Sequence, residues 1–571
     1  MIMSTTKNFL GYQKRELQSR IWKNKTKQNG KVIVLLHRGH EHSERLDEVA
    51  NYAPFNAYKK YAYDYRGHGY EKGEPCYDFM DLVRDLDCFI QFVQKDAKVA
   101  IEDIFIIANS VAGVVASTWL HDYAPKIAGA ALVAPAFKIK LYIPLAKQGL
   151  DLAVKFKPKM HIKSYVKSKF LTHDKKEQKR YNTDPLITPD IPAKQLTTLL
   201  DTAKRVVEDA AAITTPLLVL SATKDYVVES KVQGDFFANL SSPHKKFVQL
   251  DGFFHGVLYE SKKDIALQEI DTFMKSCFRA RRKPNIDDLI TYTQNERDKI
   301  AYGTLPLCLE TSFFIQRSYI NYLGSLSEGI KVGKKYGFDS GVTLDYVYRN
   351  RPRGRYYIGE FADKVYLNSI GWKGIRQRKV NLETLMVEAI DEIKWQKRDV
   401  KVMDIAGGPA KYLIEMARKY PKIDILVRDY QEQNIERGEK HARRYALKNI
   451  RYAQCDAFDP KSYQEQAFEP NIIIISGVFE LFGDNATIQK AIEGASKMLK
   501  SGDILIYTNQ PWHPQLTQIA NVLGNHQGKK WIMRRRTQCE MDTLFEKSGF
   551  RKESMLIDDY GIFTVTKAYK I

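Results

Sequence analysis

The chain has 571 residues, of which 44% are hydrophobic and 27% charged, and its formal net charge is +21. This length predicts two to four domains, the composition excludes extensive disorder, and six scattered cysteines without metal-binding spacing exclude a disulfide framework. The longest apolar runs have about a dozen residues, fewer than the roughly 20 that span a bilayer, so we expect no transmembrane helix. The first residues lack the apolar core and cleavage site of a signal peptide, which predicts a cytoplasmic protein.

From residue 31, short apolar runs alternate with longer amphipathic segments. Strands that are apolar throughout and separated by helical segments indicate a parallel sheet with helices on both faces. We therefore predict an α/β domain over residues 1–283. Residues of about 137–210 interrupt the pattern with a basic, helix-like sequence, which predicts a helical cap over the carboxyl edge of the sheet. The apolar runs are KVIVLLH, KKYAYDY, IFIIANS, IAGAALVAP, PLLVLSA and KKFVQLDG.

The predicted cap carries much of the positive charge. Residues 138–180 contain 13 Lys and Arg against 3 Asp and Glu. Such a segment attracts anionic lipid headgroups or nucleic acid phosphates by the same electrostatics, or it is a solvated face without a partner. Because apolar residues lie between the lysines and no recognised nucleic-acid module accompanies them, we favour an anionic membrane surface, which would place the protein peripherally at the inner membrane.

Ser110 lies where the predicted strand IFIIA turns into the predicted helix VAGVVASTWL. A nucleophile held in such a turn is exposed at the sheet edge, and its flanking positions must be small; Ala108 and Ala112 are small but lack the flexibility of glycine. Asp225 follows the strand PLLVLSA and His255 follows the strand FVQL. Together with Ser110 they give the order Ser, Asp, His, each at the carboxyl end of a strand. This order predicts a nucleophile, a tautomer-fixing carboxylate and a general base.

Two further segments resemble the monoacylglycerol lipase and lysophospholipase-like branch of the α/β-hydrolases. They are HRGHEHSERLDEVA from His37 and DYRGHGYEKGE from Asp64, and LTHDKKEQKRYNTDPLI is similar to the cap of that branch. The resemblance covers residues 10–278. It implies an oxyanion hole formed by the backbone N–H groups of Gly39 and Val111, and an acyl ester, in particular a lipid ester, as substrate. Arg38 stands where the family has glycine.

Three histidines in these segments raise the question of a metal ion. A His-x-His pair is formed by His40 and His42, with His68 further along the chain. No carboxylate or cysteine stands at ligand spacing from them, so we interpret them as structural residues and predict no metal site.

The apolar rhythm stops at a basic run and a proline near residues 279–286, which predicts a linker. Residues 284–390 are rich in aromatics and arginine and contain no run of strands, and we interpret them as a helical connector that belongs to the next domain. A second series then begins within residues 391–571 and predicts a second α/β domain. Its runs are DVKVMDIAGG, KIDILVRDY, IRYAQCDAF, NIIIISGVFELF, DILIYTNQ, RKESMLID and GIFTVTKAY.

The first strand of this series leads into a loop of small residues that a ligand could approach closely. A nicotinamide-binding loop and an S-adenosylmethionine-binding loop both have this character. Asp404 precedes the turn, whereas the dinucleotide fingerprint begins with glycine, so we favour S-adenosylmethionine. Ala406, Gly408 and Ala410 occupy the three usual glycine positions. We expect alanine to suffice there, on the assumption that the loop requires only small residues.

The second domain resembles class I S-adenosylmethionine-dependent methyltransferases. Asp429 ends the second strand, where a carboxylate accepts from the ribose hydroxyls, and Asp456 ends the third, where the family binds the adenine amino group. By this resemblance the neighbouring Tyr430 and Ala457 also belong to the cofactor site. The terminal hairpin is similar to the reversed last strand of the fold. No N-P-P-[FYW] motif follows the fourth strand, which argues against an adenine or glutamine amide N-methyltransferase.

The sequence thus predicts a fold class of two tandem doubly wound α/β domains, an α/β-hydrolase with a helical cap and a Rossmann-like methyltransferase. The predicted function is a bifunctional serine hydrolase and methyltransferase. The alternative is a hydrolase domain that has lost catalysis and serves as a binding or lid module for the methyltransferase, acting on RNA. The sequence does not identify the methyl acceptor or the oligomeric state.

Overall fold

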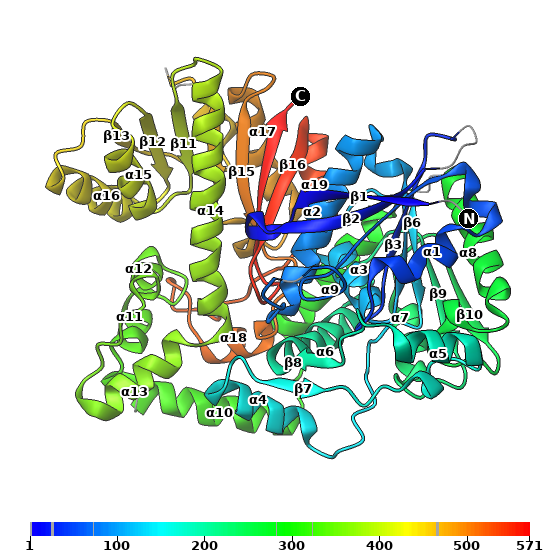
Figure 1. Cartoon of the computed structure of the whole chain (residues 1–571). Helices are drawn as coiled ribbons and strands as arrows, with labels where there is room; N and C mark the ends of the chain where they lie inside the picture. Colours follow the sequence, from blue (N-terminus) through cyan, green and yellow to red (C-terminus); the bar gives the residue numbers. More distant parts are fainter. Residues whose placement is uncertain (1–2, 24–27, 72, 281–282, 323, 464–467) are drawn as a thin grey trace. The chain divides into compact units, whose positions relative to one another are not determined.

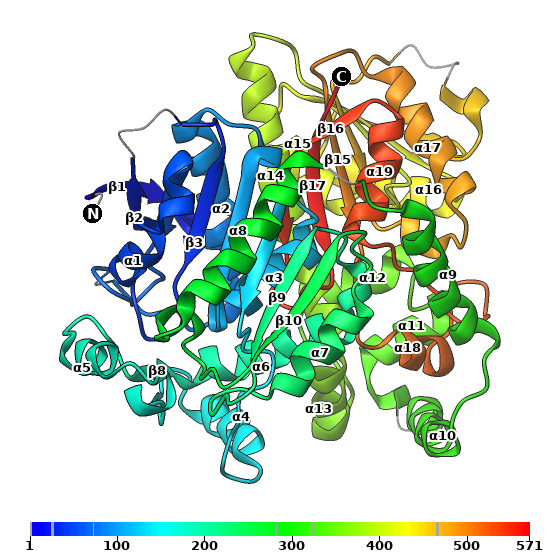
Figure 2. The ribbon, with the colours of Figure 1, turned by 90° about the vertical axis from the view of Figure 1, so that its right-hand side faces the viewer.

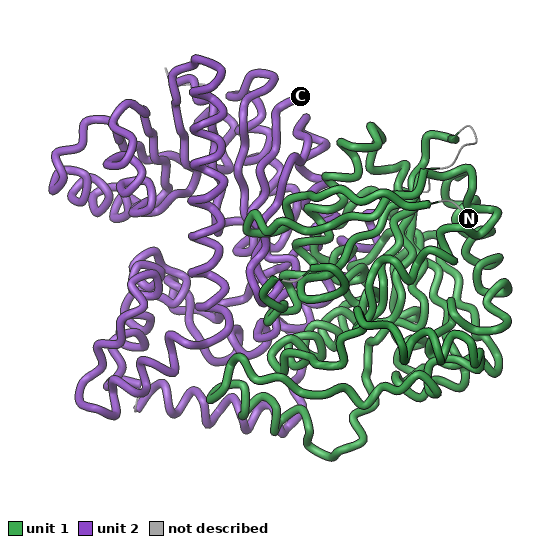
Figure 3. Tube along the Cα trace, in the orientation of Figure 1, with its two compact units in different colours: residues 1–285 green, residues 286–571 purple. Residues whose placement is uncertain are grey.

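The computed structural model describes residues 3–23, 28–71, 73–280, 283–322, 324–463 and 468–571. The chain divides into two compact units, Met1–Asn285 and Ile286–Ile571 (Figure 3). Residues 281–282 of the predicted linker lie outside the described residues.

The first unit is built on a sheet with strand order β1-β2-β4-β3-β5-β6-β9-β10 (Figure 1). The strands from β3 to β10 in this order run parallel, as predicted from their apolar runs. Their side chains are buried on both faces of most strands, because helices cover both. The bounds are β3 (Val32–Leu36), β4 (Lys59–Tyr63), β5 (Ile104–Asn109), β6 (Gly129–Val133), β9 (Leu217–Ala222) and β10 (Lys245–Leu250).

An N-terminal antiparallel hairpin, which was not predicted, extends this sheet. It consists of β1 (Ser4–Leu10) and β2 (Glu16–Trp22), and β2 pairs antiparallel with β4. In β1 only Phe9 is buried, and the other side chains are exposed or half-buried. A strand that buries one side chain has no apolar alternation, so its sequence does not reveal it.

Helices cover the two faces of this sheet. On one face, α8 (Lys263–Arg279) packs against alternate strand positions such as Ile33, Leu35 and Phe105, and Figure 2 shows it lying across the strands. The helices α2 (Phe79–Ala97) and α3 (Val111–Tyr123) pack against each other on the sheet. The unit also contains the short α1 (Asp47–Ala50) and α7 (Ser230–Asn239).

The predicted cap is partly helical and partly extended. A two-stranded antiparallel pair, β7 with β8, stands where we expected helix. Pro158 accounts for the end of α4 at Phe156, because the residue before a proline is disfavoured in the helical conformation. The last helix, α6, packs on α2 and α3 and so belongs to the body of the domain. The bounds are α4 (Ala146–Phe156), β7 (His161–Lys163), α5 (Lys175–Thr183), β8 (Asp190–Pro192) and α6 (Ala193–Glu208).

The second unit is built on a sheet with strand order β13-β12-β11-β14-β15-β17-β16. The strands from β13 to β15 in this order run parallel, and β17 enters antiparallel between β15 and β16. The reversed terminal hairpin that the sequence predicts is therefore present. The bounds are β11 (Lys401–Ile405), β12 (Asp424–Asp429), β13 (Ile450–Gln454), β14 (Ile472–Ile475), β15 (Ile504–Asn509), β16 (Phe550–Ile557) and β17 (Thr564–Lys570).

Helices again cover both faces, which makes this sheet doubly wound. Alternate residues of β11 point to opposite cores: Val402 packs with α14 and α15, and Met403 packs with α17 and α19. A third apolar core joins several helices of residues 286–395 to the segment that follows β15. The bounds are α9 (Ile286–Tyr302), α10 (Leu307–Tyr322), α11 (Glu328–Tyr336), α12 (Gly341–Arg349), α13 (Tyr356–Leu367), α14 (Ile370–Trp395), α15 (Lys411–Lys419), α16 (Glu432–Arg444), α17 (Asn485–Met498), α18 (Leu516–Val522) and α19 (Gln538–Lys547).

The predicted fold class, two tandem doubly wound α/β domains, is confirmed. Among the described residues, no helix has both the length and the apolar character needed to cross a membrane.

Candidate functional sites

Ser110 occupies a strained turn between β5 and α3. Its φ is +59° and its ψ is −114°, a conformation that few residues other than glycine adopt. Ala108 and Ala112 do not have a positive φ, so the flexibility that they lack is not required of them. Smallness is required next to them, because a Cβ at Gly113 would lie 2.7 Å from the Cβ of Pro135.

The structure brings Ser110, His255 and Asp225 together in one hydrogen-bonded chain. The Oγ of Ser110 lies 2.8 Å from Nε2 of His255, and Nδ1 of His255 lies 2.7 Å from Oδ2 of Asp225. All three side chains are buried. The sequence placed them at three strand ends, and the parallel sheet gathers those ends at one edge.

Asp225 is held in its ionised form. Burial alone would raise the pKa of this carboxyl, but the neighbouring His255 and two backbone N–H groups hold it below its ordinary value. These N–H groups belong to Val227 and Val228 and donate to Oδ1 over 2.7 and 2.9 Å. An ionised carboxylate in this place favours the tautomer of His255 that carries its proton on Nδ1.

The two predicted oxyanion donors lie against each other beside Ser110. A Cβ added to Gly39 would lie 3.2 Å from Cγ2 of Val111, and both residues line the same cavity as Ser110. His37, whose role was not predicted, fixes the peptide that carries the Gly39 N–H. Nε2 of His37 accepts from the N–H of Tyr65, so the ring proton is on Nδ1. This Nδ1–H donates to the carbonyl of Arg38 over 2.8 Å. Burial lowers the pKa of His37, which keeps the ring neutral in this arrangement.

Arg38, the departure from the family, joins a buried charged cluster. Its Nη2 donates to Oε1 of Glu41 over 2.7 Å, and its guanidinium lies 4.6 Å from the ring centre of Tyr259. Glu41 also accepts from Arg45, which in turn donates to Asp184 of the cap over 3.2 Å. The residue in the glycine position therefore helps to connect the loop after β3 to the cap.

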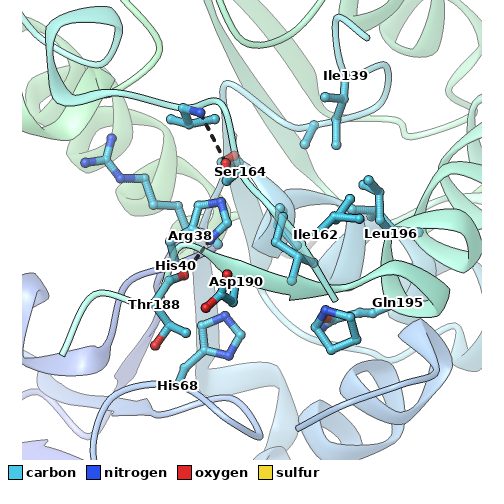
Figure 4. Close-up of a pocket in the computed structure, with 18 of the residues that line it drawn as sticks. Arg38, His40, His68, Ile139, Ile162, Ser164, Thr188, Asp190, Gln195 and Leu196 are labelled. Atoms are coloured by element: carbon cyan, nitrogen blue, oxygen red, sulfur yellow. Dashed lines mark hydrogen bonds between the residues drawn. The ribbon is translucent and has the colours of Figure 1, made fainter. Parts of the chain in front are cut away.

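A cavity of about 870 Å³ opens onto Ser110 and His255. Figure 4 shows that loop residues of the domain body, such as His40 and His68, line it together with cap residues such as Ile162 and Thr188. A cavity of this size and largely apolar lining accommodates a ligand with a long apolar part.

The three histidines considered for a metal ion are bound to other groups. His40 pairs with the carbonyl of Thr188, His42 with Asp184 and His68 with the carbonyl of Arg66. Burial lowers the pKa of His40 and of His68 to about 4. Within the described part of the chain, no three His, Cys, Asp or Glu residues form a group that could hold a metal ion.

In the second unit, Asp404 is buried at the carboxyl end of β11. Its Oδ2 accepts from the hydroxyl of Tyr412 over 2.6 Å, whereas its Oδ1 has no hydrogen-bond partner among the described residues. Burial raises the pKa of Asp404 to about 8. A carboxyl of this kind is completed by a donor or a cation that the protein itself does not provide.

The loop after Asp404 needs more than small residues, which corrects the sequence-based expectation. Ala406, Gly408 and Ala410 have φ values of +59°, +60° and +47°. The left-handed conformation brings the Cβ of an L-residue close to the following carbonyl oxygen and costs roughly 1–2 kcal/mol per residue. The two alanines therefore occupy positions where glycine would be less strained.

The remaining predicted cofactor residues lie at the ends of β12 and β13. Asp429 accepts from the N–H of Gly408 over 2.9 Å and from the N–H of Gln431 over 2.9 Å, so it connects the loop to the second strand. Tyr430 is exposed, Ala457 is buried, and Asp456 accepts from the N–H of Phe458 over 2.8 Å. These strand ends are adjacent, because β12 and β13 pair in parallel.

Sequence reasoning missed a second cavity, of about 290 Å³, in the second unit. It is lined by residues of α10 to α14 and of the segments that follow β14 and β15. Several segments that are distant in the sequence contribute to it, so no single motif reveals it.

Comparisons with known proteins support this two-part architecture. Residues 27–262 match the family model described as "Serine aminopeptidase, S33", and residues 270–570 match the one described as "Putative methyltransferase". Over 550 residues the chain is 40% identical to "Uncharacterized protein YnbC" of Escherichia coli (strain K12), which covers 95% of this chain and 94% of that protein. The chain belongs to the family that joins an α/β-hydrolase domain to a methyltransferase-family domain.

Residues of the first unit are also similar to proteins that lack most of the second. They are 28% identical over 259 residues to the monoglyceride lipase of Rattus norvegicus, covering 43% of this chain and 82% of that protein. They are 22% identical over 241 residues to phospholipase YtpA of Bacillus subtilis (strain 168), covering 41% of this chain and 90% of that protein.

Proposed function

We propose that the first domain is a serine hydrolase that cleaves an acyl ester, and that Ser110, His255 and Asp225 carry the reaction. The observation that supports this is the completed hydrogen-bond chain from Ser110 through His255 to Asp225. In the proposed reaction, Ser110 Oγ attacks the ester carbonyl carbon while Nε2 of His255 takes its proton, and His255 then returns the proton to the leaving alcohol. Water enters by the same route and releases the acid.

The N–H groups of Gly39 and Val111 would stabilise the oxyanion that forms in each step. Such donors act strongly because they are fixed before the charge develops. The hydrogen bond from His37 to the Arg38 carbonyl fixes the peptide plane of Gly39. His37 is thus a positioning residue for the oxyanion hole.

The substrate that we propose is a lipid ester, such as a monoacylglycerol or a lysophospholipid. The apolar cavity next to Ser110 suits an acyl chain, and the hydrolase relatives are a monoglyceride lipase and a phospholipase by name. Long-chain esters should therefore be better substrates than acetyl esters.

A fluorophosphonate probe tests the hydrolase. We expect a covalent adduct on Ser110 in the folded chain, and none in Ser110→Ala. Ser117→Ala is the matched control, because Ser117 is buried on α3, the helix that follows Ser110, and its hydroxyl donates to the carbonyl of Gly113. No adduct on the wild-type protein would contradict the hydrolase and favour the alternative of a binding module.

We propose that the second domain is a methyltransferase that uses S-adenosylmethionine. The residues present fit this cofactor: Asp404 has an oxygen without a partner, and a Cβ at Gly408 would meet nothing within 4 Å, so the loop is open to a ligand. Asp404 and the loop would hold its amino acid end, Asp429 its ribose and Asp456 its adenine. When bound, the cofactor supplies an electrophilic methyl group, and the domain contributes chiefly proximity and orientation.

Calorimetry of the full chain with S-adenosylmethionine and with NAD tests this assignment. We expect S-adenosylmethionine to bind with micromolar affinity and NAD not to bind. Binding of NAD alone would overturn the proposal in favour of a dinucleotide-binding domain. Reaction of the first domain with the fluorophosphonate before the titration should leave the affinity for S-adenosylmethionine unchanged.

We propose further that the cap docks on an anionic membrane surface, which would make the protein peripheral at the inner membrane. On and next to α4, Leu145, Leu152 and Phe156 are 73%, 57% and 80% exposed, among the lysines of residues 138–180. Exposed apolar side chains enter the headgroup region while lysines attract anionic lipids.

Sedimentation with vesicles tests the docking. We expect binding to vesicles that contain phosphatidylglycerol and not to pure phosphatidylcholine, with Leu152→Ser combined with Phe156→Ser weakening it about tenfold or more. Leu10→Ser is the control, since Leu10 is exposed on β1, outside the cap. Equal binding by wild type and the double variant would contradict the proposal.

A further inference from the structure

The second cavity of the methyltransferase-family domain lies at the carboxyl ends of β14 and β15. Gly477 follows β14 and Gln510 follows β15, and both line the cavity. In β11, Ile405 pairs in register with Ile475 of β14. The loop that begins at Ala406 and the loop that contains Gly477 therefore leave the sheet from neighbouring strands. A molecule in this cavity would lie beside the proposed cofactor site.

The cavity walls carry hydrogen-bond donors that the protein does not use. Nε of Arg378, Nε2 of Gln510 and Nε1 of Trp531 are buried and have no hydrogen-bond partner among the described residues. All three residues line the cavity and are less than a tenth exposed. Unpaired buried donors are costly, and proteins retain few of them. A ligand with acceptor oxygens would supply hydrogen-bond partners for these three donors.

The acidic and basic side chains of the cavity are already engaged. Glu480 pairs with Nη1 of Arg378 over 3.3 Å, and Asp339 accepts from the backbone N–H and ring of His526. Nδ1 of His513 accepts from the N–H of Gln515 over 3.0 Å, so Nε2 carries the proton. Burial lowers the pKa of His513 to about 3, in agreement with a neutral ring.

Most of the rest of the wall is apolar or aromatic, apart from Ser369 and three glutamines, Gln316, Gln515 and Gln518, that hydrogen-bond to one another. Trp372 and Trp531 lie with their ring centres 6.3 Å apart and nearly parallel, and Phe563 and Tyr366 also line the cavity. An apolar cavity of about 150 Å³ admits benzene. The volume of about 290 Å³ is roughly twice that, enough for a small ring system with a short side chain.

We propose that this cavity binds the methyl acceptor, and that the acceptor is a small carboxylic acid with an aromatic body. Arg378, Gln510 and Trp531 would hold the carboxylate, and the aromatic wall would hold the ring. This inference rests on the proposed methyltransferase function and adds the class of its substrate. The Nε–H of the Arg378 guanidinium beside neutral N–H donors suits a carboxylate, because a hydrogen bond from a charged donor to a carboxylate is stronger than one between neutral groups.

The reaction that follows needs no base. One carboxylate oxygen forms a bond to the methyl carbon of the sulfonium as the bond from carbon to sulfur breaks, and its electron pair stays on sulfur. The products are a methyl ester and a neutral thioether, and no proton is released. This agrees with a cavity in which Glu480, Asp339 and Nδ1 of His513 already have hydrogen-bond partners.

The test begins with binding to the full chain in the absence of cofactor. Calorimetry compares phenylacetate, 3-phenylpropionate and 1-naphthoate with the amide of each acid. We expect the carboxylates to bind at least about tenfold more tightly than the amides, because hydrogen bonds to a charged group are stronger. Gln510→Met and Trp531→Phe should each weaken carboxylate binding about five- to tenfold.

Gln510→Met should not lower the unfolding temperature, since the amide N–H that it removes has no partner among the described residues. Ser554→Ala is the matched control: its hydroxyl is also buried without a partner, on β16 and outside the cavity, and carboxylate affinity should not change. Carboxylates that bind no more tightly than amides, or affinities that Gln510→Met leaves unchanged, would overturn the proposal.

A second measurement separates this inference from the proposed function. With S-adenosylmethionine present, mass spectrometry should detect the methyl ester of a bound acid. Cofactor binding together with carboxylates no better than amides would overturn the acceptor class and leave the methyltransferase standing. Carboxylate binding that depends on Gln510, without any cofactor binding, would support the carboxylate site and contradict the methyltransferase.

Discussion

Asp225 in the first domain and Asp404 in the second are both buried at the carboxyl ends of parallel strands, but their pKa values shift in opposite directions. Burial acts on both carboxyls to raise the pKa. At Asp225 it is outweighed by His255 and two backbone N–H groups, and the pKa falls. At Asp404 the main compensating bond comes from Tyr412, the negative charge of Asp429 is close, and the pKa rises to about 8.

The difference reflects how each site is built. The hydrolase site is complete without a ligand, because its three side chains are one another's partners. In the cofactor site, Asp429 binds the N–H groups of its own loop and Asp404 keeps an oxygen without a partner. The first site should therefore fail when a side chain is changed. The cofactor site should respond to substitutions that change the backbone conformation of its loop and to the binding of a ligand.

The largest effect is expected from Asp225→Asn. An amide cannot hold His255 in the required tautomer, so kcat for a lipid ester should fall by about 10⁴-fold while the protein remains folded. Steady-state hydrolysis of a monoacylglycerol measures it. Asp404→Asn is the comparison variant and should leave hydrolysis unchanged. A loss of less than tenfold in Asp225→Asn would show that the hydrogen-bond chain is not the catalytic device.

Asp429→Asn should weaken S-adenosylmethionine about ten- to hundredfold. The substitution removes the charge that would accept from the ribose and weakens the bonds that hold the loop at Gly408 and Gln431. Calorimetry gives the affinity, and ester hydrolysis by the same variant should stay at the wild-type rate. Unchanged cofactor affinity would exclude Asp429 from the site.

Some of this architecture could be predicted from the sequence, and physical reasons separate those parts from the rest. The parallel strands were predictable because burial on both faces makes them apolar throughout, whereas β1 buries only Phe9 and was missed. The order Ser110, Asp225, His255 was predictable because Ser110 and Asp225 follow such strands and His255 follows β10, the edge strand of the same sheet.

Other features depend on contacts between distant segments. Arg38 could be recognised only as a departure, since its cluster includes Tyr259 and, through Arg45, Asp184 of the cap. The cavity that contains Arg378 and Gln510 is assembled from helices and loops more than 100 residues apart. The positive φ of Ala406 is a property of the folded loop, which composition does not show.

The pH dependence of the stability of the second domain should differ between the wild-type protein and the variant Asp404→Asn. The pKa of Asp404 is raised from 3.8 to about 8, so between these pH values the folded chain holds a proton that the unfolded chain has released. The unfolding free energy of the second domain should therefore fall as the pH rises from 4 to 8 and level off above. Asp404→Asn should flatten this slope and stabilise the domain at pH 9 by about 2 kcal/mol, measured by urea unfolding without cofactor. A slope equal to that of the wild type would contradict the shift.

The smallest effect is expected on stability, when the two alanines of the cofactor loop and the two alanines that flank Ser110 are each replaced by glycine. Ala406→Gly and Ala410→Gly should each stabilise the second domain by about 1 kcal/mol, because glycine relieves a positive φ that costs more than its own extra entropy in the unfolded chain. Ala108→Gly and Ala112→Gly should instead destabilise the first domain by about the same amount, since their φ values are ordinary and only the entropy changes. Calorimetric unfolding of the four variants gives the signs. If all four shift the same way, loop strain does not distinguish the two sites, and the alanines of the cofactor loop are tolerated for their size alone.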